Sequence, residues 1–128
     1  MKIKISGRKS FALLAFLPFL FAGCQQPGQG GTSHDPINRK ADHLIYTRHA
    51  RCRMDCRHIT ETEIREILER GEIDYRKSEP DAQPDPKYAL EGNTVEGQHL
   101  RIIFAPSDRG LVVITCIELG VEWKCDCN

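Results

Sequence analysis

The spacing of apolar residues predicts two consecutive helices after residue 42. In the first, Tyr46, Ala50 and Met54 recur at helical spacing within "DHLIYTRHARCRMDCR", residues 42–57. The aliphatic stem of Arg57 continues the same stripe. We therefore expect a short apolar stretch followed by a helix that turns this stripe toward the core.

The second helix has clear signals at both of its ends. Thr60 and Glu63 have the spacing of a capping box, and Ile59 is placed to pack on Ile64 as a hydrophobic staple. Gly71 follows as a natural C-cap. The expected core-facing stripe consists of Ile64, Ile67 and Leu68.

After residue 71 the apolar pattern changes to the alternation of strands. "EIDYRK" predicts an edge strand, and the three prolines of "SEPDAQPDP" (residues 78–86) exclude regular structure after it. "LVVITCIEL" is apolar on both faces, which predicts a central strand covered on both sides. The expected strands are residues 72–77, 87–92, 98–105 and 111–119.

These elements predict a single α+β domain over residues 42–128. Its expected architecture is two N-terminal helices packed on one face of a small antiparallel sheet of about four strands, in the order α-α-β-β-β-β. A domain of this size has a small core, so covalent or metal cross-links would stabilise it.

The N-terminus has the features of a bacterial lipoprotein signal peptide. Four basic residues precede the apolar run "FALLAFLPFLFA" (residues 11–22), which is shorter than the roughly 20 residues that span a bilayer. The run ends on "LFAGC", which resembles a lipobox with Cys24 as the lipidated residue, although Phe21 stands where an aliphatic residue is commoner. We expect residues 1–23 to be the signal peptide. An ordinary secretory signal with an incidental cysteine is the alternative.

This assignment determines the expected location and charge of the mature chain. Residues 24–41, rich in Gly, Gln and Pro, would tether the domain to a lipid anchor in the cell envelope. Gln25 is not the Asp of inner-membrane retention, which favours the outer membrane. Subtracting the leader's four cations from the 18 basic residues leaves 14, against 18 acidic residues. We therefore expect the membrane as a partner and expect no nucleic acid.

Four outer cysteines form the clearest chemical constellation. On a helix, His49, Cys52 and Cys56 share one face, and on an extended tail Cys125 and Cys127 point the same way. Disulfides between helix and tail are the favoured interpretation outside the cytoplasm, because a disulfide within either pair would be strained. The alternative is a zinc or copper site with thiolate ligands and, in one version, His49.

The remaining two cysteines have separate expected roles. Cys24 would carry the lipid, and Cys116 lies in the predicted central strand, where a free cysteine behaves as a small buried hydrophobe. Trp123, beside the tail cysteines, is expected to pack the tail onto the domain.

The segment from residue 43 to residue 118 resembles an uncharacterised bacterial family, domain of unknown function 4258. The most specific match is the run "H-A-x-x-R-M-x-x-R-x-I", formed by His49, Ala50, Arg53, Met54, Arg57 and Ile59. The family is similar in fold to the BrnT and RelE toxins, which are ribonucleases. The resemblance therefore implies a RelE/BrnT-like fold, and it raises ribonuclease activity as one hypothesis.

A ribonuclease of this fold would need cations for the phosphate and a general acid or base. The candidate catalytic residues are His49, Arg53, Arg57 and His58, with Lys77 and Arg101 from the strands. Structural ion pairs with Asp55, Glu61 or sheet carboxylates are the alternative role for the arginines.

Three functional hypotheses remain open at this point. The favoured one is a non-catalytic envelope module that binds a protein or a small ligand, or that is structural. A lipoprotein outside the cytoplasm meets no translating ribosome, and no common nucleophile-elbow, phosphate-loop or zinc-protease motif is present. The metal-binding protein and the ribonuclease toxin are the alternatives.

Overall fold

The computed structural model describes residues 34–128. The expected signal peptide, Cys24 and the first part of the tether lie outside these residues. Within them, no helix is long and apolar enough to cross a membrane. The elements are β1 (Leu44–Tyr46), α1 (Arg48–Arg57), α2 (Glu61–Arg70), β2 (Glu72–Glu79), β3 (Lys87–Asn93), β4 (His99–Ser107) and β5 (Gly110–Glu118).

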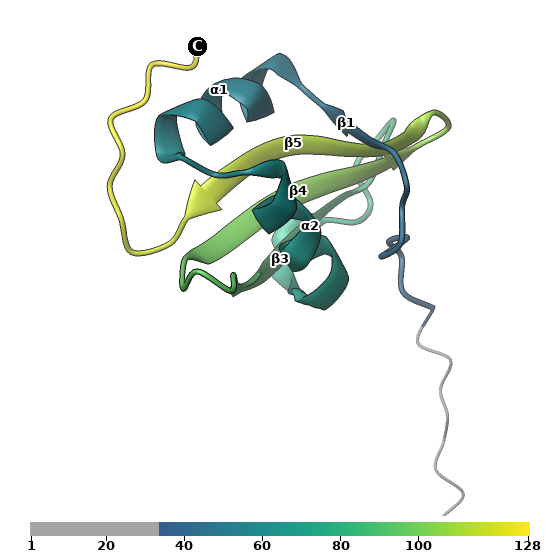
Figure 1. Cartoon of the computed structure of the whole chain (residues 1–128). Helices are drawn as coiled ribbons and strands as arrows, with labels where there is room; N and C mark the ends of the chain where they lie inside the picture. Colours follow the sequence, from purple (N-terminus) through teal and green to yellow (C-terminus); the bar gives the residue numbers. More distant parts are fainter. Residues whose placement is uncertain (1–33) are drawn as a thin grey trace, which may run out of the picture. The chain divides into compact units, whose positions relative to one another are not determined.

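The domain is α+β, with two helices on one five-stranded sheet in the order β1-β5-β4-β3-β2 (Figure 1). Strands β2 to β5 pair antiparallel with their neighbours in sequence, as expected, and β2 is the predicted edge strand. Helices α1 and α2 share one core with the sheet face that carries Leu90, Ile102 and Phe104.

Strand β1 corrects the predicted topology. It pairs parallel with β5, from Leu44 opposite Leu111 to Tyr46 opposite Val113, so the sheet is mixed and begins with a strand rather than a helix. Tyr46, expected on the helical stripe, therefore lies in β1. Three residues are too few to show a strand period, and their partner lies far along the chain.

Thr47 separates β1 from α1 and explains why the helix begins there. Its backbone N–H donates to the carbonyl of Val113 at 3.1 Å, and its Oγ1 donates to the carbonyl of Ile114 at 2.9 Å. The same Oγ1 accepts from the N–H of Ala50 at 2.9 Å, as an N-cap does. Thr47 thus joins the helix start to β5.

Helix α1 ends at His58, which adopts the left-handed conformation with φ 55°. The N–H of Ile59 returns to the carbonyl of Met54 at 2.9 Å, which satisfies a helix-end acceptor. Ala50 and Met54 are buried, so the predicted core stripe of α1 is confirmed from residue 50 onward.

The predicted ends of α2 are confirmed. The Thr60 side chain accepts from the N–H of Glu63, and the Glu63 carboxylate accepts from the N–H of Thr60 at 2.7 Å. Gly71 is the C-cap, and a Cβ there would lie 2.5 Å from the carbonyl oxygen of Ile67. Glycine is required at this position by the close approach of the backbone.

Strand β5 is an interior strand, but only one of its faces is fully buried. Leu111, Val113 and Cys116 point into the core, whereas Val112 and Thr115 are half-buried on the opposite face. Both helices lie on the same side of the sheet (Figure 1). The prediction of a strand covered on both sides is therefore wrong.

The packed part of the chain begins before residue 42. Ile37 is 3% exposed within the core, and Ala41 is also buried. The guanidinium of Arg39 donates to the carbonyls of Leu68 and Gly71 at 3.0 and 2.6 Å. The stretch from residue 37 to residue 41, expected as the end of the tether, is thus attached to the end of α2.

Candidate functional site

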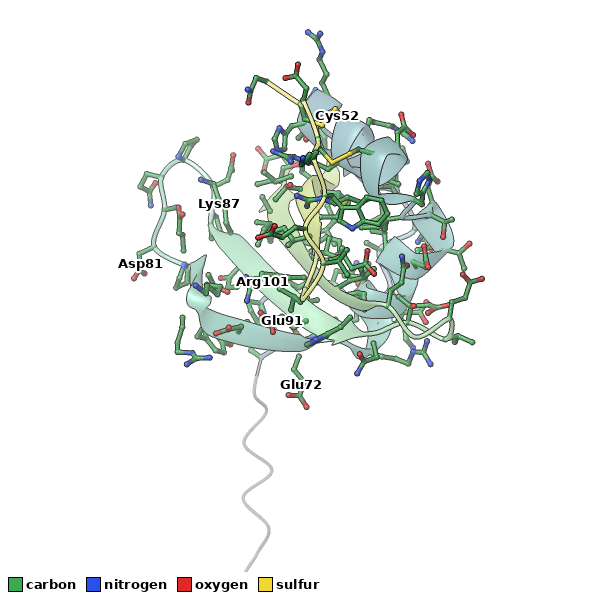
Figure 2. All side chains as sticks on the ribbon, turned by 90° about the vertical axis from the view of Figure 1, so that its left-hand side faces the viewer. Cys52, Glu72, Asp81, Lys87, Glu91 and Arg101 are labelled. Carbon is green, nitrogen blue, oxygen red and sulfur yellow. A yellow bond between two sulfur atoms is a disulfide. The ribbon has the colours of Figure 1, made fainter. Side chains whose placement is uncertain are left out.

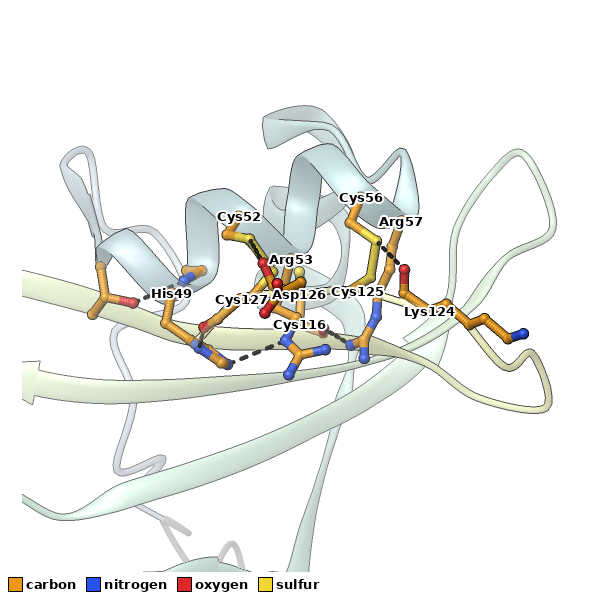
Figure 3. Close-up of a disulfide and its surroundings, with 12 residues drawn as sticks. His49, Cys52, Arg53, Cys56, Arg57, Cys116, Lys124, Cys125, Asp126 and Cys127 are labelled. Atoms are coloured by element: carbon orange, nitrogen blue, oxygen red, sulfur yellow. Dashed lines mark hydrogen bonds between the residues drawn. A yellow bond between two sulfur atoms is a disulfide. The ribbon is translucent and has the colours of Figure 1, made fainter.

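Two disulfides join α1 to the C-terminal tail. Cys52 pairs with Cys127 and Cys56 pairs with Cys125, with Cα–Cα distances of 5.7 and 5.9 Å. After β5 the tail turns back and runs along α1 (Figures 1 and 3). Cross-pairing between helix and tail is confirmed. The connectivity follows from the direction of the tail, which runs antiparallel to α1 and therefore reaches Cys56 before Cys52.

The stabilisation by each cross-link depends on whether the other is already formed. Either one alone closes a loop whose ends are 69 or 75 residues apart. Such a loop contributes about 4.4 kcal/mol in the chain-entropy model. Once one is formed, the other closes a ring of only about eight residues through the 52–56 and 125–127 segments, which contributes about 2.5 kcal/mol. The first link to form therefore provides most of the stabilisation.

His49 contacts the tail beside the Cys52–Cys127 disulfide. Its Nδ1 lies 3.1 Å from the carbonyl oxygen of Cys127, and its Nε2 accepts from Nε of Arg53 at 3.3 Å (Figure 3). A hydrogen on Nδ1 and a free lone pair on Nε2 would satisfy both contacts. A cleft of about 460 Å³ opens here, lined by Arg48, His49, Cys52, Asp126, Cys127 and Asn128.

Arg57 binds the backbone of β5 rather than a carboxylate. Its Nη1 donates to the carbonyl of Cys116, where β5 extends beyond the end of β1 (Figure 3). Burial, and then the neighbouring charge of Arg53, lower the pKa of Arg57, and its Nε is buried without a partner. Arg57 therefore caps an otherwise open strand edge, which is a structural role.

Cys116 is the free cysteine of the described chain and is completely buried. Burial raises the pKa of its thiol to about 11, although Arg57 and Arg53 act in the opposite direction. The expected role as a small core hydrophobe is confirmed.

His58 and Trp123 pack the tail between the last strand and α1. The indole N–H of Trp123 donates to Oε2 of Glu118 at 2.8 Å, and its ring meets the His58 imidazole edge-on at 5.6 Å between centroids. The expected packing role of Trp123 fits these contacts, and His58 serves as both a helix cap and a packing partner.

Arg101 and Lys77 lie on other parts of the sheet. Arg101 pairs with Glu91 across β4 and β3, away from Cys52 (Figure 2). Lys77 is exposed on β2, which is three strands from β5 and therefore roughly 14 Å from it. The six residues proposed for catalysis thus do not gather at one point within residues 34–128.

The expected ion pairs of α1 are formed by a different arginine. Arg51 pairs with Glu61 at 2.8 Å and lies over the Tyr46 ring at 4.4 Å from its centroid. Arg51 was not among the residues predicted to form ion pairs. The position of Tyr46 in β1, which brings the ring under the guanidinium, could not be read from local spacing.

A second cleft, of about 540 Å³, lies over the paired strands β2 and β3 and was not predicted. Its walls carry both charge signs, and they consist of Arg70, Glu72, Ile73, Asp74, Arg76, Glu91, Gly92, Asn93 and His99. Burial would raise the pKa of Asp74, but the backbone N–H and the guanidinium of Arg76, with Arg101, lower it overall. The charged residues at every second position of "EIDYRK", Glu72, Asp74 and Arg76, were the available signal for this surface.

The metal alternative depends on the oxidation state of the four outer cysteines. A sulfur in a disulfide offers no thiolate to zinc or copper. Among residues 34–128 as they stand, no group of three or more His, Cys, Asp or Glu side chains is arranged to hold a metal ion. Zinc or copper binding by these cysteines would require their reduced form.

A family model described as "Domain of unknown function (DUF4258)" matches residues 46–118, which is more than half of the chain. The chain belongs to this family. The DUF4258 match extends from the end of β1 to the end of β5, so Cys52 and Cys56 lie within it and Cys125 and Cys127 lie beyond it. The disulfides thus attach the tail to the DUF4258 domain. No curated protein and no solved structure matches the chain.

Proposed function

We propose that this DUF4258 chain is a membrane-anchored protein of the bacterial cell envelope. Its anchor would be a lipid on Cys24, and its domain would act outside the cytoplasm as a non-catalytic binding or structural module. The lipobox-like "LFAGC" and the cationic leader support the anchor.

The two helix-to-tail disulfides are the observation that carries the proposal. Disulfides form and persist in oxidising compartments and are rare in the cytoplasm. They account for four of the six cysteines, and buried Cys116 and the leader's Cys24 account for the other two. The sequence signal for export and the cysteine pairing therefore favour the same location.

The contacts of the arginines support a non-catalytic domain. Arg57 is bound to a strand carbonyl and Arg101 is paired with Glu91, so each already has a structural partner. A ribonuclease site would need several cations directed at one phosphate. The mixed-charge cleft over β2 and β3 is the surface that we propose for a polar small ligand or a protein segment.

Fractionation of cells that express the full chain tests the anchor. We expect the wild-type protein in the membrane fraction and the Cys24→Ala variant outside it. Cys116→Ala is the matched control, because it also removes one free thiol but leaves the lipobox intact, and it should remain with the membrane. Membrane association of Cys24→Ala equal to that of the wild type would refute the anchor.

Expression of the leaderless chain in the cytoplasm tests the non-catalytic assignment. We expect growth equal to that of an empty-vector strain. Growth arrest that Arg53→Ala or His49→Ala relieves, at equal protein level, would instead favour a toxin-like activity at these residues and overturn the proposal.

A further inference from the structure

The two disulfides differ in what surrounds them. Cys52 and Cys127 both line the cleft of about 460 Å³ at the start of α1, whereas neither Cys56 nor Cys125 belongs to its lining. A volume of this order suits a small molecule. Cys52–Cys127, called the outer disulfide from here on, is therefore the one that opens onto this cleft, while all four cysteines are half-buried.

Other contacts attach the tail to the domain besides the outer disulfide. The inner disulfide, Cys56–Cys125, would still attach the tail to α1, and Trp123 would still bind Glu118 and His58. Opening the outer link releases the constraint of a small ring only, because the long loop remains closed. We therefore expect the tail to stay attached to α1 when Cys52–Cys127 is reduced.

Two arginines of α1 are neighbours of Cys52. Arg48 lines the same cleft, and Arg53 follows Cys52 on α1 and donates to His49. Among residues 34–128, neither arginine forms an ion pair with a carboxylate. Asp126 also lines the cleft, on the tail beside Cys127, and its backbone carbonyl oxygen lies 3.6 Å from Sγ of Cys52. Cationic neighbours lower a thiol pKa and make it a better leaving group.

We propose that Cys52–Cys127 is an exchange-active disulfide that reacts with small thiols, while Cys56–Cys125 is a structural cross-link. A thiolate from the small molecule attacks Sγ of Cys127, the S–S bond breaks, and Cys52 leaves as a thiolate. A second small thiolate attacks the mixed disulfide and releases Cys127. Two thiols are oxidised to one small disulfide, and their two electrons and two protons convert the protein disulfide to two thiols.

This proposal rests on the two observed disulfides and does not depend on the lipid anchor. Failure of the fractionation experiment would therefore leave it unaffected, and failure of the exchange experiment would leave the anchor unaffected.

Timed alkylation of the full oxidised chain tests the proposal directly. The protein is incubated with reduced glutathione, quenched with N-ethylmaleimide at intervals, and mapped by peptide mass. We expect Cys52 and Cys127 to be labelled at least about tenfold faster than Cys56 and Cys125. Equal labelling rates for the two pairs, or faster labelling of Cys56 and Cys125, would overturn it.

Charge variants test the cause of the selectivity. Replacing Arg48 and Arg53 together by Gln should slow labelling of Cys52 by about threefold or more, because the leaving thiolate loses its cations. Arg51→Gln is the matched control on the same helix, since Arg51 is already paired with Glu61, and it should label at the wild-type rate. A double variant as fast as Arg51→Gln would contradict the assigned role of the arginines.

Discussion

Arg53 and Arg57 occupy equivalent positions one helical turn apart on α1, yet their contacts differ. Arg53 donates to a histidine at the rim of a cleft, and Arg57 donates to a strand carbonyl. Both residues are arginines, so the sequence alone did not distinguish their roles. The difference arises because β1 ends at Tyr46 and leaves the later part of β5 without a neighbouring strand on that side. At the scale of single residues, placement relative to the sheet decides what each cation does.

Loss of the Arg57 donor should destabilise the domain. Arg57→Met keeps an apolar stem but leaves the buried Cys116 carbonyl without its donor, so we expect unfolding free energy to fall by about 1–3 kcal/mol. Urea denaturation measures the change. Arg70→Gln, which removes a pair with Glu66 whose arginine is 60% exposed, should cost under about 0.5 kcal/mol. Equal effects of the two variants would contradict the structural role of Arg57.

The buried thiol of Cys116 predicts a loss of stability in alkali. Its pKa is about 11 in the folded chain and 9.0 as the ordinary value, so between these pH values the unfolded state gives up a proton that the folded state keeps. Unfolding free energy should therefore be unaffected by this group below pH 9 and fall by up to about 2.5 kcal/mol as the pH rises to about 11.

Cys116→Ala provides the control for this pH dependence. Its unfolding free energy, measured in urea, should be lower than that of the wild type below pH 9, because a core side chain is truncated. It should decline less between pH 9 and 11. Burial, with the charge of Glu61, also raises the pKa of Tyr46, so a residual decline is expected in both proteins. Parallel curves for wild type and variant would rule out Cys116 as the cause.

At the scale of elements, α2 is determined mainly by local signals. The Thr60–Glu63 capping box satisfies two backbone donors at its start. We expect Thr60→Ala to lower unfolding free energy by about 1 kcal/mol in urea denaturation. Thr62→Ala, at an exposed position of the same helix, should change it by less than about 0.5 kcal/mol. A Thr60→Ala protein as stable as the Thr62→Ala protein would show that the cap does not matter.

The contrast between α2 and β1 shows which features the sequence could predict. The cap, the staple and the apolar stripe of α2 all lie within a dozen residues, so local spacing predicts the helix and its ends. Strand β1 depends on pairing Leu44 with Leu111, which no local pattern reveals. Cross-pairing of the outer cysteines was predictable, because each local pair is strained. Its connectivity, and the position of Arg57 against β5, required the three-dimensional path of the tail.

At the scale of the whole molecule, the tail disulfides connect the last segment of the chain to its first helix. Their contributions should be strongly non-additive. Replacing either pair by serines should lower unfolding free energy by about 2.5 kcal/mol, because the remaining link still closes the long loop.

Replacing all four outer cysteines should lower it by about 7 kcal/mol, since both the small ring and the long loop then open. Denaturant titration of the two double variants and the quadruple variant measures these changes. If the loss of unfolding free energy in the quadruple variant only equals the sum of the losses in the two double variants, the shared-loop description is contradicted.

The central claim is that the chain is an envelope protein whose tail is closed onto α1 by Cys52–Cys127 and Cys56–Cys125. The most direct test is to purify the full-length protein from the membrane fraction under alkylating conditions and to measure its mass before and after reduction. We predict a lipidated Cys24, a gain of four hydrogens on reduction, and cross-linked peptides that join these two pairs. A membrane-free protein with four alkylated outer cysteines, or a native mass that carries a zinc or copper ion on unpaired thiols, would contradict the account.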